Sequence, residues 1–161
     1  MDRTSVDSHP AAAASSRRTT GSGVVFGVGL AAFVDETVFH QLLHWHHFYD
    51  RSTPAAGLVS DGVFHAFGWF AVVAALFLLV DVGRRGVLRW RRWIGALLLG
   101  AGGFQLYDGV IQHKLMRLHQ IRYHVDVVPY DIAWNVAAVV MIIIGGVVLV
   151  HSSRRAGHAR A

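Results

Sequence analysis

Apolar residues gather in four blocks along the chain, and polar or charged segments separate them. The blocks cover about residues 24–45, 63–80, 93–115 and 132–150. Each is close to the ~20 residues that an α-helix needs to cross the hydrocarbon core of a membrane. A soluble bundle is the alternative, but a chain of 161 residues has too little polar sequence to cover four such helices. The pattern therefore predicts an all-α membrane protein with four transmembrane helices.

Basic residues concentrate on one side of this arrangement. The chain has 15 Lys and Arg against 10 Asp and Glu, a net charge of +5. Most of the cations fall before the first helix, between the second and third, and after the fourth. By the positive-inside rule these segments and both termini are cytoplasmic, while the loops 48–60 and 118–128 face outward. The basic balance thus reflects membrane topology, and no nucleic-acid-binding motif accompanies it.

The two ends of the chain are polar. Residues 1–22 are rich in Ala, Ser, Thr and Gly, a composition that predicts a disordered cytoplasmic tail. Residues 151–161 form a second, basic tail on the same side. The predicted transmembrane domain therefore occupies residues 23–150.

The chain contains an internal repeat. Residues 27–48 align without a gap with residues 100–121, at a shift of 73, and share the pattern G-x-G-x5-D-x4-H-x5-H. The next helix in each copy also begins alike, with Asp61 or Asp131 followed four residues later by His or Asn. We therefore expect two tandem helical hairpins, related by an axis along the membrane normal. The repeated glycines are expected to let helices pack closely.

Ionisable residues lie inside the predicted helices, where each costs about 3 kcal/mol or more unless it is paired or hydrated. Asp35 and Asp108 fall near the bilayer centre, and His40 and His113 follow toward the outer face. In an ideal α-helix, an Asp and a His five residues apart point about 140° away from each other. Either each helix builds two linked sites with its neighbours, or it unwinds near its outer end.

The candidate chemistry is that of imidazole and carboxylate without sulfur, because the chain has 11 His and no Cys. Such a set is typical of a transition-metal site for zinc, copper or iron, used in redox chemistry or metal handling. Three alternatives stay open: a proton relay, a structural polar network, and a b-type haem between His40 and His113 in a quinone-linked electron carrier. A non-catalytic subunit of a membrane complex is a further class. No catalytic nucleophile or phosphate loop is recognisable, so enzymatic activity stays open.

Several motifs resemble the DUF2243 family of prokaryotic integral membrane proteins. They are FVD at 33–35, HQLL at 40–43, WHH at 45–47, DGVFHAF at 61–67 and DGVI at 108–111. The resemblance covers about residues 23–150. It implies a four-helix protein of the inner (plasma) membrane of a bacterium or archaeon, without implying an activity.

The resemblance also narrows the candidate site. In this family glycine is common at the position of Glu36 and glutamine at that of His44, so these two residues are set aside. The expected metal ligands are the remaining repeated acids and histidines: Asp35, His40, His46, His47, Asp61, His65, Asp108, His113 and His119. The expected partners are the lipid bilayer and, if the protein assists assembly, another membrane protein complex.

Overall fold

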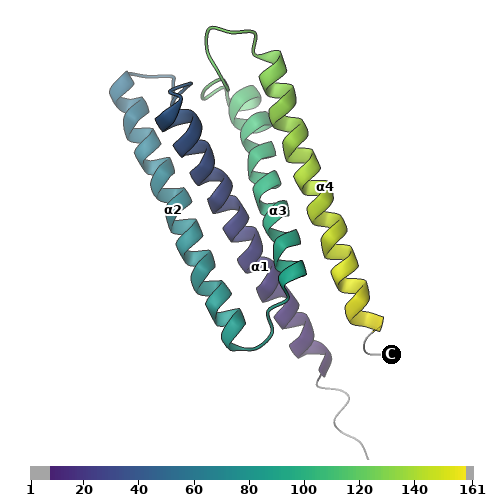
Figure 1. Ribbon diagram of the computed structural model, residues 1–161. Coiled ribbons are helices and arrows are strands. Elements are labelled where there is room, and N and C mark those ends of the chain that lie inside the picture. The colour runs from purple at the N-terminus through teal and green to yellow at the C-terminus, as the bar shows by residue number, and fades with distance from the viewer. Residues whose placement is uncertain (1–7, 159–161) are drawn as a thin grey trace, which may run out of the picture.

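The computed structural model describes residues 8–158, which form four long helices arranged as two antiparallel pairs, α1 with α2 and α3 with α4 (Figure 1). They are α1 (Ser8–Asp35), α2 (Pro54–Arg84), α3 (Trp90–Tyr107) and α4 (Val128–His158). Two π-helices, η1 (Glu36–Leu42) and η2 (Asp108–Met116), continue α1 and α3. The described residues contain no strand. The predicted all-helical fold is thereby confirmed.

Each helix is long and apolar enough to cross a membrane. The four spans are Ala13–Leu42, Pro54–Arg84, Trp90–Met116 and Val128–Arg154. They hold 27–31 residues, which at ~1.5 Å per residue exceeds a hydrocarbon core of ~30 Å. The flanking helices expose large apolar side chains such as Phe70, Phe77 and Ile143. The protein thus spans the membrane four times, and these side chains contact lipid.

The helices lie in a row in the order α2–α1–α3–α4 (Figure 1). In the described part of the chain, α2 packs mainly against α1 and α4 mainly against α3, and single ring contacts join Phe64 to Phe104 and Phe39 to Trp134. The contact between α1 and α3 therefore joins the two hairpins. It also brings η1 and η2 together at one end of the molecule.

Two glycines at equivalent positions allow α1 and α3 to touch. A Cβ atom on Gly27 would lie 2.0 Å from the carbonyl oxygen of Leu97, and one on Gly100 would lie 2.2 Å from a carbonyl oxygen of α1. No side chain fits at either position. The second glycine of each copy allows close packing within its own hairpin, since Gly29 packs on α2 and Gly102 on α4. The packing role expected of the repeated glycines is confirmed.

Helix α1 begins earlier than the sequence predicts. Disorder was expected over residues 1–22, but the chain is helical from Ser8 onward. The alanines of this segment favour a helix, and its polar side chains find partners in the neighbouring helices. Ser22, for example, is buried, donates to a carbonyl of α2 at 3.1 Å and accepts from Trp93 Nε1 at 3.2 Å. The structure thus has helix from Ser8 on within the segment predicted as a tail, and residues 1–7 lie outside the described part.

The other helices also differ in length from the apolar blocks. Helix α2 begins at Pro54 rather than near residue 63, with the hydroxyl of Thr53 accepting the N–H of Ala56 at 3.3 Å as an N-cap. Helix α4 continues through the predicted basic tail as far as His158. The last three residues lie outside the described part. Polar sequence next to a span thus extends the helix instead of ending it.

Candidate metal centre

Each central helix widens into a π-helix where the repeated Asp and His residues lie. A π-helix closes each turn with an i→i+5 hydrogen bond, so residues five apart lie almost above one another. Asp35 and His40 have this spacing, as do Asp108 and His113. The distance from the Asp Oδ2 to the His Nε2 is 3.9 Å in the first pair and 3.1 Å in the second. The wider turn reduces the offset of an ideal α-helix and brings each pair together.

Beyond each π-helix the chain turns at a residue in the left-handed conformation. These residues are His44, with φ of 49°, and Arg117, with φ of 52°, and they lie 73 positions apart. One residue later, in both copies, a backbone N–H donates to the carbonyl six residues back, at 2.9 and 3.0 Å. The two matching turns lead the chain back across the helix end. They place His46 and His119 beside the Asp-His pairs.

The left-handed turns give a first prediction. The side chain of Arg117 is exposed, so its replacement removes few contacts. Arg117→Gly is expected to raise the free energy of unfolding by up to about 1 kcal/mol, because glycine adopts positive φ without cost. Arg117→Val is expected to lower it by about 1–2 kcal/mol, because a β-branched residue resists this conformation. Unfolding midpoints in detergent measure both, and equal effects of the two variants would contradict the role of the turn.

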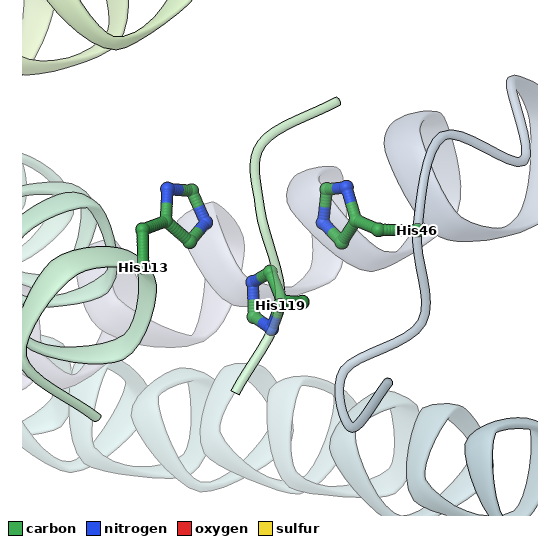
Figure 2. A group of neighbouring side chains, drawn as sticks. All are labelled: His46, His113 and His119. Atoms are coloured by element: carbon green, nitrogen blue, oxygen red, sulfur yellow. The ribbon is translucent and has the colours of Figure 1, made fainter. Parts of the chain in front are cut away.

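Four histidine rings meet at this end of the molecule. His40 and His113 come from the π-helices, and His46 and His119 come from the segments after them. The ring centroids are 4.4 Å apart for His40 and His46, 4.5 Å for His46 and His119, and 4.6 Å for His113 and His119. Figure 2 shows three of the rings, from separate segments, turned toward one another. All four side chains are buried.

Two hydrogen bonds, exchanged between the hairpins, orient two of the rings. His46 Nδ1 bonds the carbonyl oxygen of Ile121 at 2.9 Å, and His119 Nδ1 bonds that of Phe48 at 2.8 Å. Because a carbonyl only accepts, Nδ1 carries the proton in both rings and Nε2 keeps its lone pair. The Nε2 atoms of all four histidines are buried without a hydrogen-bond partner. Such unpaired buried atoms are uncommon and call for a ligand.

Two carboxylates lie beside these rings. Asp108 Oδ1 is 3.7 Å from His119 Nε2, and Asp35 contacts His40 as described above. Burial lowers the pKa of His46 well below its usual range. Burial also lowers the pKa of His119 to about 4, although the Asp108 carboxylate opposes this shift. Both rings are therefore neutral at pH 7, the form that binds a metal ion.

Outer groups hold this arrangement in place. Asp61 of α2 accepts from His40 Nδ1 at 3.2 Å and from the N–H of Phe48 at 2.7 Å, and its other oxygen bonds His47 Nδ1 at 2.6 Å. Gln112 donates to Asp108 Oδ1 at 3.1 Å. Partners of this kind fix the orientation of potential ligands.

The structure thus gathers most of the predicted site residues but not all of them. Two aspartates and four histidines form a single cluster, named here the six-residue centre: Asp35, His40, His46, Asp108, His113 and His119. Asp61 and His47 lie one contact further out. His65 lies apart and packs on the ring of Phe33, with centroids 5.2 Å apart.

Sequence reasoning missed one residue at the cluster. Glu36 is fully buried, and its Oε2 lies 2.8 Å from His40 Nδ1. Its i,i+4 spacing to His40 was a usable signal, but the family pattern led to its exclusion. His44, excluded on the same ground, is exposed.

The comparisons with known proteins agree with this fold. Residues 22–152 match the family model described as "Predicted membrane protein (DUF2243)". No curated protein and no solved structure matches the chain. Since the match covers most of the chain, including the second and third spans in full and every residue of the six-residue centre, the chain belongs to the DUF2243 family of predicted membrane proteins.

Proposed function

We propose that this protein binds a transition metal ion at the six-residue centre. The observation that carries the proposal is the set of four buried histidine Nε2 atoms without hydrogen-bond partners, drawn from both hairpins. Burying an unpaired polar atom costs about 1–3 kcal/mol, and a metal ion would compensate this cost for the histidines that bind it.

The spacing of the ligand atoms supports this proposal. In the groups Asp35–His40–His46 and His46–His113–His119, the potential ligand atoms lie within 4.8 Å of one another. Ligands of a tetrahedral ion with bonds of about 2.0–2.1 Å lie ~3.3 Å apart, so small side-chain movements would close either group on an ion. Imidazole with carboxylate suits zinc, copper or iron.

The position of the centre in the molecule fits a role in redox chemistry or metal handling at the outer side of the membrane. The centre lies at the end of the molecule away from the arginine-rich loop between α2 and α3. By the positive-inside rule that loop is cytoplasmic, and the centre faces the outer side of a prokaryotic plasma membrane. A site there would meet metal ions outside the cytoplasm, or would serve another membrane protein complex that needs one.

The packing of the rings argues against a haem between His40 and His113. The His46 and His119 rings stack at 4.5 Å with planes 4° apart, and both lie next to the His113 and His40 rings. A porphyrin plane would have to displace this stack. The residues present therefore fit a bare ion better than a macrocycle.

The test is metal analysis of the detergent-purified protein, before and after incubation with Zn(II), Cu(II) or Fe(II). We expect at least about one tightly held ion per chain for one of these metals, because the His46 and His119 imidazoles are neutral and the ligand atoms are prearranged. An absorbance spectrum of the same preparation should lack the Soret band of haem. Protein that stays metal-free under every loading condition would overturn the proposal.

A further inference from the structure

A second cluster of metal-ligand side chains lies on the other nitrogen of the His40 ring. The Nε2 of His40 faces the six-residue centre, whereas its Nδ1 faces two carboxylates. Glu36 Oε2 lies 2.8 Å from Nδ1, and Asp61 Oδ1 lies 3.2 Å from it. All three side chains are at least 99% buried. We propose that these residues hold a second metal ion, so that the His40 ring bridges two ions when Asp35, His40 and His46 hold the first.

Hydrogen bonds do not satisfy this cluster. The Nδ1 atom carries at most one proton, and Asp61 Oδ1 is the oxygen in line to accept it. Glu36 Oε2 is close but out of line, and it has no hydrogen-bond partner although it is fully buried. The other oxygen of Glu36 accepts from Gln41 Nε2 at 2.7 Å. The buried Oε2 atom of Glu36 thus faces His40 Nδ1 without accepting its proton, because that proton is donated to Asp61.

The separations of the ligand atoms fit one bound ion. Nitrogen and oxygen ligands at about 2.0–2.2 Å from an ion lie roughly 2.9–3.5 Å apart at neighbouring coordination positions. The two distances at His40 Nδ1, 2.8 and 3.2 Å, lie at or close to this range. Asp61 accepts hydrogen bonds from His47 Nδ1 and from the N–H of Phe48, and these bonds already orient its carboxylate toward the cluster. An ion here would replace the Nδ1 proton, which would leave to solvent.

A second ion would also compensate charge on the buried acids next to His40. Four carboxylates are buried at this end of the molecule: Asp35, Glu36, Asp61 and Asp108. Among the side chains that the structure describes, histidines pair with all four of these acids, whereas Lys114 pairs with Asp131, and Arg18 and Arg85 pair with Asp81. Uncompensated buried charge is strongly unfavourable. An ion held by Glu36 and Asp61 would compensate the charge of these two carboxylates in their ionised form, as the first ion would for Asp35 or Asp108.

Among the described residues, the second hairpin has no cluster equivalent to Glu36, His40 and Asp61. The position that corresponds to Glu36 is Gly109, where a Cβ atom would lie 2.7 Å from Asn135 Oδ1. The acid that corresponds to Asp61 is Asp131, which is engaged by Lys114. His113 Nδ1, the counterpart of the bridging nitrogen, has no partner at all. The second site is therefore particular to the first hairpin.

This inference rests on the proposed function for the first ion, and metal stoichiometry separates the two. The probe is Zn(II) added to the metal-depleted full-length protein in detergent, with excess ion removed before analysis. We expect about two ions per chain in the unaltered protein and about one in Glu36→Gln, which keeps the size of the side chain but removes its charge. Asp131→Asn is the matched control, because it removes the corresponding acid of the second hairpin, and it should retain about two.

Four results would contradict some part of this scheme. About one ion in both the unaltered protein and Glu36→Gln would overturn the second site and leave the first standing. About two ions in both proteins would place the second ion elsewhere and would also overturn it. Loss of an ion in Asp131→Asn as well would overturn the assignment of the second ion to Glu36, because removal of an acid outside the cluster would then have the same effect. No ion in the unaltered protein would overturn both proposals together.

A spectroscopic measurement covers the case in which Glu36→Gln fails to fold. Two ions about 2.1 Å from the two nitrogens of one imidazole lie roughly 6 Å apart, close enough for their spins to couple. We expect the unaltered protein, loaded fully with Cu(II), to show an electron paramagnetic resonance spectrum of coupled pairs. The spectrum of isolated Cu(II) at full loading would overturn the bridge.

Discussion

His113→Ala is expected to lower the affinity of the six-residue centre for its metal ion by at least about 100-fold. Loss of an outer partner that only orients a ligand already costs about 10–100-fold, and His113 offers a ligand atom itself. Its Nε2 is buried, has no hydrogen-bond partner and belongs to the group with His46 and His119. Competition with a chelator of known affinity measures the change on the purified protein.

The matched control is His65→Ala, which removes an identical side chain from α2. His65 packs on Phe33 and belongs to no potential ligand group within the described residues. We expect this variant to bind the ion within a few-fold of the unaltered protein. Circular dichroism and size-exclusion chromatography of both variants would show that the helices are intact. Equal losses in the two variants would mean that histidine removal acts through folding rather than through a ligand atom.

Gly27→Ala is expected to give the largest loss of stability of any single methyl addition in the central contact. The new Cβ atom would lie 2.0 Å from the carbonyl oxygen of Leu97 and 2.8 Å from the backbone nitrogen of Ala101, and neither atom belongs to a flexible side chain. Helices α1 and α3 would have to move apart. Overpacking typically costs about 1–3 kcal/mol, and a clash between two backbones falls at or above the upper end.

Gly103→Ala provides the control for this substitution. Gly103 lies in α3, and a Cβ atom there would meet no atom within 4 Å. We expect its unfolding midpoint to stay unchanged or rise slightly, since alanine favours helix by up to about 1 kcal/mol. The Gly27→Ala variant should in addition retain less metal at a fixed concentration of free metal ion. The six-residue centre takes its ligands from both sides of the α1–α3 contact, which this substitution opens. Similar midpoints for the two variants would contradict the close packing of α1 and α3.

The four helices could be predicted from the sequence because they depend on composition. The packing glycines could be predicted because they recur at an exact spacing. Blocks of about 20 apolar residues indicate spans whatever their neighbours are. The shift of 73 residues pairs Gly27 with Gly100 directly, without knowledge of the structure. The same shift correctly pointed to His40, His46, His113 and His119 as related residues. It did not show that they meet.

The local backbone at the centre was not predictable from the same patterns. Hydropathy does not distinguish an i→i+5 turn from an i→i+4 turn, so the pattern left Asp35 and His40 on different faces. The left-handed turns occur at His44 and Arg117, neither of which is glycine, so no residue signalled them. Glu36 was set aside because it departs from the family pattern, although burial next to His40 makes it part of the local chemistry.

The exchanged hydrogen bonds have a consequence for how the protein is assembled. His46 is held by a carbonyl of the second hairpin, and His119 by a carbonyl of the first. Neither hairpin can therefore orient its own ligand before the two have docked. Membrane helices insert individually and associate afterwards, so the centre would form only in that last step. Under the proposed function, metal capture would act as a checkpoint on maturation, distinguishing a finished molecule from one whose halves are still apart.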